Sequence, residues 1–354
     1  MKYLFTVQGE GRGHMTQALA IKELIEKEGH EVVCVLIGTN RKKGVPDFFK
    51  NAFDCKVSTM SSPNFVFDKT GGVNNFKTVI DNIISFPKYL VSLKRIRTAI
   101  KKFKPDAVIN FYEPMFGVYR LLGGYCKKSF AMGHQFMFLH PDYVCNKSSE
   151  HKIEMFGAKL FTRLIGFKSK KIALSITKEK DINGITIVPP ILREDVFKGK
   201  TKTNKFVLIY TMSRAYGKDF LMESPHDIKF EVFTEKFWPS DSNTMKFGNI
   251  TFNQLDGKKF LNYMKKCEMV VCSAGFETAS EASYLGKKVM VIPTENHTEQ
   301  YFNGWDFQLN GLAKLKQNFK NISTEDVKLD TTAIKRFKKW VDSYKTEFKK
   351  ALEL

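Results

Sequence analysis

The residues Tyr3-Leu-Phe-Thr-Val-Gln8 lead directly into Gly9-Glu-Gly-Arg-Gly-His-Met-Thr16, and this stretch decides the fold. The apolar run predicts a buried strand, and the apolar periodicity over residues 14–29 predicts a helix after it. Glycines between a strand and a helix let the backbone turn sharply, and they let a ligand approach the helix N-terminus, where N–H groups and the helix dipole favour an anion. The stretch therefore predicts the start of a parallel βαβ sheet with an anion-binding loop.

The same alternation of short apolar strands and longer helices continues along the chain. In the first half it predicts strands at 31–38, 56–60, 106–111, 129–132 and 172–176, and helices at 74–104, interrupted at Phe86-Pro87, and 150–167. In the second half it predicts strands at 206–211, 228–233, 250–253, 268–272 and 288–293, and helices at 257–267, 276–285, 298–310 and 332–352. A proline-bearing, lysine-rich stretch over 185–205 separates the two series.

This pattern predicts an α/β protein of two Rossmann-like, doubly wound parallel-sheet domains that face each other across a cleft. We place the first domain at residues 1–198 and the second at 199–330. Residues 331–354 form a basic C-terminal helix, with the option of crossing back to the first domain.

The chain has 354 residues, of which 43% are hydrophobic, a fraction typical of globular proteins and too high for a disordered one. Its formal net charge is +20, and residues 1–200 hold 33 basic and 18 acidic side chains, a net of +15. Such a basic half favours an anionic partner. Nucleic acid is excluded because no recognition motif for it is present and the basic residues are spread over many helices.

Residues 88–104 predict an amphipathic basic helix, for which two interpretations remain open. Its apolar stripe packs on the sheet with the basic face in water, or the basic face contacts an anionic membrane surface. No apolar run approaches the ~20 residues of a membrane span, and the apolar start is too short for a signal peptide. The six cysteines form no CxxC pair. We expect a reduced, cytoplasmic chain, with peripheral binding at the inner face of the membrane as an option.

The glycine loop does not fit the common nucleotide motifs. The third glycine of a dinucleotide fingerprint is replaced by His14, the second strand ends at Gly38-Thr39-Asn40 without an acid, and the lysine of a P-loop is absent. His14 needs its own explanation. A helix N-terminus disfavours the imidazolium form, so a neutral histidine acting as a base is reasonable there, and a histidine that merely caps the turn is the alternative.

A second cluster, Cys272-Ser-Ala-Gly-Phe-Glu-Thr-Ala-Ser-Glu281, follows a predicted strand and opens a helix. Ser273, Gly275 and the amides of residues 275–278 are suited to hold a phosphate. Glu281 is placed to accept hydrogen bonds from ribose hydroxyls, and the loop 295–300 follows the next strand at the same edge. The alternative for the acids of this helix is a favourable interaction with its dipole.

These residues, together with Tyr284-Leu-Gly-Lys287, Val291-Ile-Pro293 and Glu299-Gln300, resemble the donor-binding half of GT-B nucleotide-sugar glycosyltransferases. The likeness is closest to family 28, which includes the peptidoglycan N-acetylglucosaminyltransferase, and to a branch that begins with a GEGRGH-like loop. The resemblance implies that His14 lies near the acceptor hydroxyl or the donor phosphates, that Gly275 and its neighbours hold the diphosphate, and that Glu281 binds the ribose. It also implies that Glu299 and Gln300 read the donor sugar.

Three further features complete the candidate site. Ser213 lies in a loop that the resemblance places at the phosphates, although it lacks the usual glycines. Glu113 follows a strand and either orients His14, serves as the base or caps the helix at Pro114. His134 and Gln135 either contact acceptor or sugar or form a buried pair. The candidates are catalytic His14 and Glu113; donor-binding Gly11, Gly13, Ser213, Ser273, Gly275, Phe276, Glu277, Thr278, Glu281, Glu299 and Gln300; and, for acceptor or sugar, His134 and Gln135.

The resulting prediction is a glycosyltransferase that moves a sugar from a nucleoside diphosphate sugar, with UDP favoured, to an acceptor hydroxyl. The acceptor is a lipid-linked molecule, a glycan or a small molecule. No DxD motif surrounds Asp54 or Asp241, so we expect no metal and no cofactor, and transfer with inversion. The alternatives are a nucleotide-sugar 2-epimerase, which needs further acids, and a non-catalytic nucleotide-sugar-binding or membrane-scaffold subunit.

Overall fold

The computed structural model describes residues 1–354 except 41–43, 69–71, 183, 212–227, 235–237 and 239–240. The chain divides into two compact units. Unit 1 consists of Met1–Val66, Asn75–Arg193 and Trp340–Leu354, and unit 2 consists of Phe67–Asn74 and Glu194–Lys339. The chain therefore passes between the units at four points, two of which flank the short segment Phe67–Asn74. The sequence placed that segment in the first domain.

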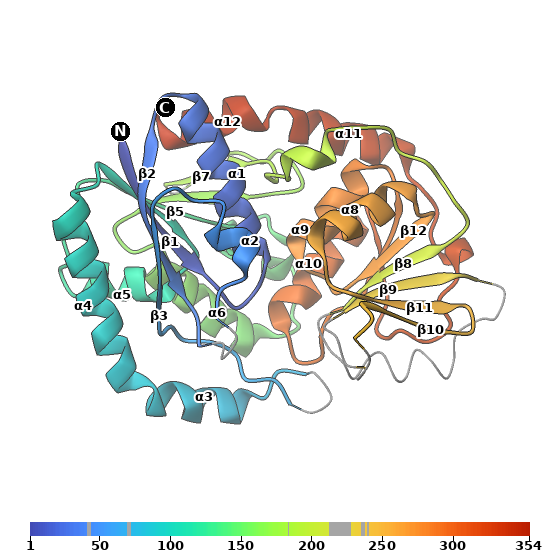
Figure 1. Cartoon of the computed structure of the whole chain (residues 1–354), viewed down its shortest axis with the longest axis horizontal. Coiled ribbons are helices and arrows are strands. Elements are labelled where there is room, and N and C mark those ends of the chain that lie inside the picture. The colour runs from blue at the N-terminus through green and yellow to red at the C-terminus, as the bar shows by residue number, and fades with distance from the viewer. Residues whose placement is uncertain (41–43, 69–71, 183, 212–227, 235–237, 239–240) are drawn as a thin grey trace. The chain divides into compact units, whose positions relative to one another are not determined.

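Unit 1 is built on a seven-stranded, fully parallel sheet with the order β3-β2-β1-β4-β5-β6-β7 (Figure 1). Its strands are β1 (Lys2–Gln8), β2 (Glu31–Gly38), β3 (Lys56–Met60), β4 (Ala107–Phe111), β5 (Ser129–Gly133), β6 (Lys170–Leu174) and β7 (Ile185–Val188). Its α-helices are α1 (Gly13–Lys27), α2 (Asp47–Lys50), α3 (Asn75–Ile84), α4 (Phe86–Phe103), α5 (Pro114–Leu121), α6 (Lys152–Ile165) and α12 (Tyr344–Leu352). The predicted break at Phe86-Pro87 is confirmed, because α4 starts there with proline in its first turn.

The sheet of unit 1 is covered on both faces, as the near-continuous apolar strands predict. Leu4 packs with Ile96 of α4 and Phe116 of α5 in one core cluster. The next residue along the strand, Phe5, points to the opposite face and meets Phe111 at a ring-centroid distance of 5.0 Å. The apolar stripe of α4 thus packs on the sheet, as one of the two interpretations of residues 88–104 predicted.

Unit 2 has a second seven-stranded sheet with the order β10-β11-β9-β8-β12-β13-β14, in which only the β10–β11 pair is antiparallel. Its strands are β8 (Val207–Tyr210), β9 (Phe230–Thr234), β10 (Thr244–Phe247), β11 (Ile250–Gln254), β12 (Met269–Cys272), β13 (Lys288–Val291) and β14 (Lys314–Leu315). Its helices are α8 (Gly257–Lys266), α9 (Phe276–Tyr284), α10 (Thr298–Leu309) and most of α11 (Thr331–Asp342). The edge strands β10 and β14 were not predicted, because β10 is polar and exposed and β14 has two residues.

The prediction of one C-terminal helix over 332–352 is wrong at Ser343, where α11 ends and α12 follows. The Ser343 hydroxyl donates to the carbonyl oxygen of Trp340 at 2.7 Å, and this local bond competes with helix continuation. The indole of Trp340 donates to the carbonyl oxygen of Ser175 at 2.9 Å. This contact ties the chain end from Trp340 onward to unit 1, so the C-terminus returns to the first unit.

Among the parallel strands, strand order reverses once in each sheet, between β1 and β4 in unit 1 and between β8 and β12 in unit 2. Ligands of such sheets bind beyond the carboxyl ends of the strands at this point. The loop Gly9–Arg12 follows β1, Tyr112 and Glu113 follow β4, and Ser273–Gly275 follow β12. The predicted architecture of two doubly wound sheets is confirmed. No helix in the described ranges is long and apolar enough to cross a membrane.

Gly9 and Gly11, in the loop that follows β1, differ in how closely they are packed. A Cβ on Gly9 would lie 2.7 Å from Cγ2 of Ile37 and 2.9 Å from the carbonyl oxygen of Gly38, whereas a Cβ on Gly11 would meet nothing closer than 4.0 Å. We expect Gly9→Ala to lower the free energy of unfolding by about 1–3 kcal/mol through overpacking, and Gly11→Ala to leave it within about 0.5 kcal/mol. Urea denaturation measures both, and equal stabilities would contradict this packing.

Candidate active site

The glycine loop of unit 1 is tied to the ends of neighbouring strands. The Gly9 N–H donates to the carbonyl oxygen of Gly38 at 2.8 Å, and the carboxylate of Glu10 accepts from the backbone N–H of Asn40 at 2.9 Å. The loop ends in α1, whose N-cap residue Arg12 makes no side-chain cap. The first N–H groups of α1, which begins at Gly13, are therefore not capped by the Arg12 side chain, as an anion-binding helix start requires.

The surroundings of His14, in the first turn of α1, favour a neutral imidazole. Its ring stacks on Tyr112 with a centroid distance of 5.7 Å and an interplanar angle of 18°. Nδ1 lies 3.3 Å from Oε1 of Gln17, which only accepts hydrogen bonds, so Nδ1 carries the proton and Nε2 presents a lone pair. Nε2 has no hydrogen-bond partner among the residues that the structure describes. Burial lowers the pKa of His14 to about 4, against the opposing effect of Gln17.

Gln17 and Tyr112 were missed by the sequence analysis. Gln17 lies three residues after His14, a spacing that brings side chains together on a helix, so that signal was available. Tyr112 follows β4 and adopts a left-handed backbone with φ of 55°, and its hydroxyl lies 2.7 Å from that of Thr162 on α6. Only the sheet order brings Tyr112 beside the first helix.

Glu113 caps α5 and is fully buried. One carboxylate oxygen accepts from the N–H of Phe116 at 2.9 Å and the other from the hydroxyl of Ser62 at 2.6 Å. Burial raises its pKa to about 7, although these hydrogen bonds oppose the change. Of the three roles predicted for Glu113, the structure shows the capping role. Among the described residues Gln17, and not Glu113, is the hydrogen-bond partner of the His14 ring.

His134 and Gln135 follow β5 and are buried. Nδ1 of His134 donates to the carbonyl oxygen of Leu174 at 2.7 Å, and its Nε2 accepts from the hydroxyl of Tyr143 at 3.0 Å. With both ring nitrogens used inside the protein, the buried-pair interpretation is favoured over contact with acceptor or sugar. Gln135 also has partners within the protein.

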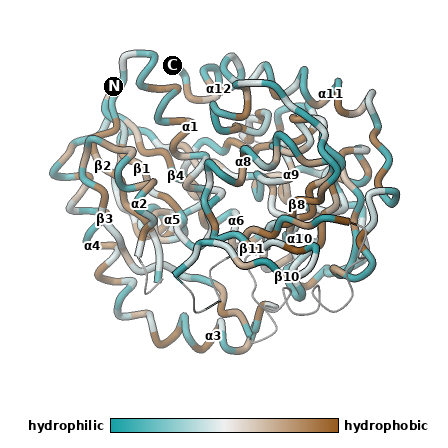
Figure 2. The backbone as a smooth tube through the Cα atoms, turned by 45° about the vertical axis from the view of Figure 1, so that its right-hand side comes forward, coloured by the Kyte–Doolittle hydropathy of each residue, from teal (hydrophilic) through white to brown (hydrophobic). Residues whose placement is uncertain are grey.

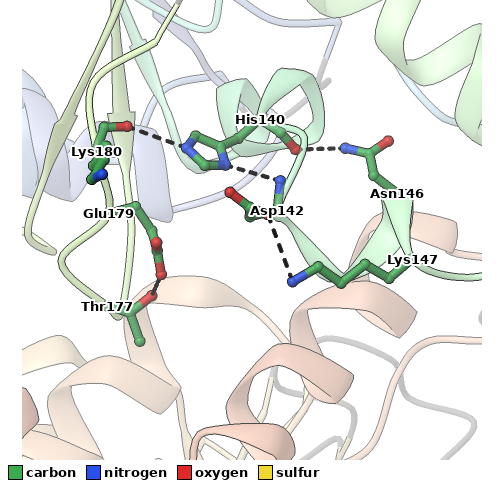
Figure 3. A network of polar contacts seen from close by, with 7 residues as sticks. All are labelled: His140, Asp142, Asn146, Lys147, Thr177, Glu179 and Lys180. Atoms are coloured by element: carbon green, nitrogen blue, oxygen red, sulfur yellow. Dashed lines mark hydrogen bonds and ion pairs between the residues drawn. The ribbon is translucent and has the colours of Figure 1, made fainter.

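A third histidine beyond the same strands is used in the same way. Nε2 of His140 donates to the carbonyl oxygen of Lys180 at 3.2 Å, and Nδ1 accepts from the N–H of Asp142 at 3.2 Å (Figure 3). The amide of Asn146 donates to the His140 carbonyl oxygen at 2.6 Å. The network joins the loops that follow β5 and β6, so both ring nitrogens of His140 hold backbone groups, whereas His14 uses only Nδ1.

In unit 2, the loop Ser273–Gly275 leads from β12 into α9. Gly275 is the N-cap, and no side chain caps the helix, in contrast to α8 and α10, which are capped by Asp256 and His297. Ser273, Glu277 and Thr278 are partly exposed around this helix start. Phe276 is buried and packs edge-on against Phe307, so its side chain belongs to the core and only its backbone remains a candidate for donor binding.

The start of α10 lies beside this loop because two residues that the sequence analysis missed hold it there. The amide of Asn303 donates to the carbonyl oxygen of Ala274 at 3.2 Å, and a Cβ on Gly304 would come within 3.5 Å of the Ala274 side chain. Glu299 and Gln300, in the first turn of α10, are thus brought into the same part of unit 2 as the α9 start. The sequence signal was the polar and small pair at consecutive helix positions.

The structure does not show a ligand-binding role for the two remaining candidates, Glu281 and Ser213. Glu281 is only 3% exposed and has partners within the protein, so its binding of ribose stays a prediction. Ser213 lies outside the described residues. Within the described part of the chain, no group of three His, Cys, Asp or Glu side chains is arranged to hold a metal ion.

The buried carboxyl of Glu113 should make the free energy of unfolding depend on pH. It holds its proton more tightly in the folded protein than in the unfolded chain, so its contribution to stability is complete below pH 4.5 and is lost as the pH rises through about 7. The loss is about 3 kcal/mol. Glu113→Gln cannot ionise, so this part of the pH dependence should disappear from its free energy of unfolding.

Urea denaturation of both proteins between pH 4.5 and 7.5 measures the difference. The lowered pKa values of His14 and His297 act in the opposite direction but are common to both proteins and cancel. Parallel curves for the two proteins would show that Glu113 does not titrate in this range.

Comparison with known proteins gives the family. The model of glycosyl transferase family 1 matches residues 1–337. No curated protein matches. Among solved structures, CalG4, the calicheamicin glycosyltransferase, has a TM-score of 0.63 at 14% identity over 99% of this chain and 96% of its own. UGT2 of Phytolacca americana has a TM-score of 0.60 at 12% identity, with 99% and 98% covered. MurG of Acinetobacter baumannii has 0.50 at 14% identity, with 100% and 95% covered.

MurG belongs to family 28, to which the sequence motifs pointed, and all three structures share the GT-B fold with this chain. The match to the family model spans nearly the whole chain and both sheets. The chain is therefore a glycosyltransferase and belongs to glycosyl transferase family 1.

Proposed function

We propose that this glycosyltransferase moves a sugar from a nucleoside diphosphate sugar, with UDP as the favoured base, to an acceptor hydroxyl, with inversion and without a metal ion. The observation that carries the proposal is His14. It is a neutral histidine whose Nε2 lone pair is available at a helix start beyond the strand-order reversal of unit 1. A neutral histidine with an available lone pair can accept the proton of an acceptor hydroxyl.

The start of α9 is the proposed site of the diphosphate. Its backbone N–H groups lack a side-chain cap, and the helix dipole favours negative charge there. Gly275 has no side chain that would hinder a ligand at this helix start. The space beside it is open, because a Cβ at this position would meet nothing closer than 3.9 Å. Glu281 is the proposed ribose ligand. UDP is favoured because the UGT2 structure of Phytolacca americana holds UDP-2-fluoroglucose.

The proposed step is a single displacement. The acceptor oxygen forms a bond to the anomeric carbon and its proton passes to Nε2 of His14, while the bond from the anomeric carbon to the diphosphate breaks and its electron pair leaves with the nucleotide. Attack on the face opposite the leaving group inverts the configuration. The preorganised N–H groups of α9 stabilise the developing phosphate charge, which is the task that a metal would otherwise perform.

His14→Gln tests the base. We expect turnover to fall by about 10²–10⁴-fold while the KM of the nucleotide sugar changes little, because the variant loses proton transfer and keeps the donor site. Gln17→Leu should give a smaller loss of turnover, since it removes only the acceptor that fixes the ring tautomer. Initial rates with a panel of UDP-, TDP- and GDP-sugars measure both, and wild-type turnover in His14→Gln would remove His14 from the mechanism.

The same panel separates an enzyme from a binding subunit. Nucleotide sugars should raise the melting temperature of the wild-type protein, because a ligand of the native state stabilises it by mass action. Stabilisation without release of the nucleoside diphosphate would favour the non-catalytic alternative. Glycosyl transfer to water, detected as slow release of the diphosphate, would support the transferase before an acceptor is known.

We also propose that unit 1 binds an anionic membrane surface through α3. In contrast to an ordinary surface helix, α3 directs two polar residues, Thr78 and Asn82, toward the protein. The amide of Asn82 donates to the carbonyl oxygen of Asn64 at 3.0 Å, and the hydroxyl of Thr78 accepts from the N–H of Val66 at 2.9 Å. No residue of α3 is buried.

The apolar side chains of α3 are exposed. Figure 2 marks several residues along this helix as hydrophobic. We call the α3 apolar face the exposed side chains of α3 and the start of α4: Phe76, Val79, Ile80, Ile83, Ile84, Phe86, Leu90 and Val91. Between residues 76 and 94 the chain carries Lys77, Lys88 and Lys94 against one acid, Asp81. Lysines around an apolar face favour the headgroup region of an anionic bilayer. The proposed contact thus moves from the basic face of residues 88–104 to α3.

Flotation with anionic liposomes tests this surface. The double variant Ile83→Glu/Ile84→Glu should reduce binding at least about tenfold, because two side chains that would be buried in the bilayer become charged. Phe247→Glu, at an equally exposed apolar residue of unit 2, should bind like the wild type. A wild-type protein that does not float contradicts the proposal, and a dimer that the double variant dissociates would assign the face to a second copy.

A further inference from the structure

A short segment between β3 and α3 leaves unit 1 and joins unit 2. We call its described residues Phe67, Asp68 and Gly72–Asn74 the strap. Phe67 and Val73 pair as an antiparallel bridge, and the N–H of Asp68 donates to the carbonyl oxygen of Gly72 at 2.9 Å. The carboxylate of Asp68 accepts from the Gly72 N–H at 3.0 Å in return. The strap therefore has a defined backbone structure of its own.

The strap binds the loop that follows β13. The N–H of Val73 donates to the carbonyl oxygen of Glu295 at 3.1 Å, and the Val73 side chain is only 3% exposed. Gly72 lies so close to the loop that a Cβ there would be 3.3 Å from Cβ of Glu295. A larger residue would press directly on this loop, so both the glycine and the valine fit the contact.

The loop itself is a tight turn that ends in α10. Asn296 adopts the left-handed conformation with φ of 57°, and the N–H of His297 donates to the carbonyl oxygen of Thr294 at 3.1 Å. His297 then caps α10, with Nδ1 accepting from the N–H of Gln300 at 3.4 Å. Glu295 and Asn296 are exposed, so the strap supplies a contact to the part of the turn that the core does not cover.

Gln300 is connected to this turn at both its backbone and its side chain. Its Oε1 accepts from the N–H of Thr294 at 2.8 Å. This bond fixes the orientation of the side-chain amide, and Nε2 has no hydrogen-bond partner among the described residues. An amide nitrogen only donates, so a sugar oxygen bound by Nε2 must accept the hydrogen bond, as a hydroxyl oxygen can.

We propose that the strap and His297 are positioning elements for the donor sugar: Val73 and His297 hold the turn 294–297 so that Gln300 keeps its Oε1 on Thr294 and presents Nε2 to a sugar hydroxyl. This inference rests on the proposed function, in which Gln300 reads the sugar of the nucleotide sugar. It adds that residues which do not touch the sugar set the direction of that hydrogen bond, and that one of them comes from the chain between β3 and α3.

Two pairs of variants separate positioning from general stability. Val73→Pro removes the N–H that bonds Glu295, whereas Val73→Ala keeps it and loses only packing. His297→Leu removes the cap on Gln300, whereas His297→Asn replaces it with an acceptor that caps helices well. Each pair contrasts a variant that frees the turn with one that retains its hydrogen bond.

Two ligands are titrated into each purified full-length variant: the nucleotide sugar that gives the best response with the wild type, and the matching nucleoside diphosphate without sugar. For Val73→Pro and His297→Leu we expect the KM and Kd of the nucleotide sugar to rise about tenfold, the scale of one neutral hydrogen bond. The Kd of the nucleoside diphosphate should stay within about twofold, because the sugar contact alone is lost. Val73→Ala and His297→Asn should lie nearer the wild type for both ligands.

The outcomes are distinct. Equal weakening of both ligands, or a lower melting temperature with unchanged affinities, would show that the strap and cap serve stability and would overturn the inference. The same is true if His297→Asn fails as badly as His297→Leu. If the wild-type protein shows no detectable binding of any nucleoside diphosphate sugar, the proposed function itself is wrong, whatever the variants do.

Discussion

Parallel strand pairing is the constraint on which the site depends. In a parallel sheet the carboxyl ends of all strands lie at the same edge. Residues that follow neighbouring strands therefore meet there, although they are far apart in the chain. The pairing of β1 with β4 brings Tyr112 beside His14, across about a hundred residues of sequence. In unit 2 the pairing of β12 with β13 brings the loop Ser273–Gly275 beside the start of α10.

The second constraint is the supply of hydrogen-bond donors at helix starts. Every α-helix begins with N–H groups that have no partner within the helix. In this protein α5, α8 and α10 satisfy theirs with Glu113, Asp256 and His297, while α1 and α9 have no side-chain cap. The helices α2, α4, α6 and α12 also start without a side-chain cap, but only α1 and α9 among the uncapped helices follow β1 and β12 at the strand-order reversals. A missing cap leaves N–H groups available, and the position at the strand-order reversal selects the helix starts of α1 and α9 as those suited to an anion.

Three histidines of unit 1, His14, His134 and His140, illustrate how tertiary contacts assign chemistry to a residue type. His134 and His140 have both ring nitrogens bonded to backbone or to Tyr143, so they fix loops. His14 uses only Nδ1, on Gln17. The sequence predicted His14 from its place in the glycine loop, but it offered the same residue type at 134 as a sugar contact. Only the partners of each ring, supplied by distant strands, separate a base from a structural histidine.

The sequence by itself determined the two doubly wound sheets, most of their element bounds, and the glycine loops at residues 9–13 and 273–275, because apolar periodicity and glycine placement are local properties of the chain. The tertiary structure alone decided that Glu113 is a buried cap, that α3 turns its polar side inward, and that residues 67–74 leave the first unit to bind the loop before α10. These outcomes depend on which surfaces and hydrogen-bonding groups are already occupied by distant segments. The sequence pattern of a helix indicates that one side is apolar, but tertiary packing determines whether that side is buried.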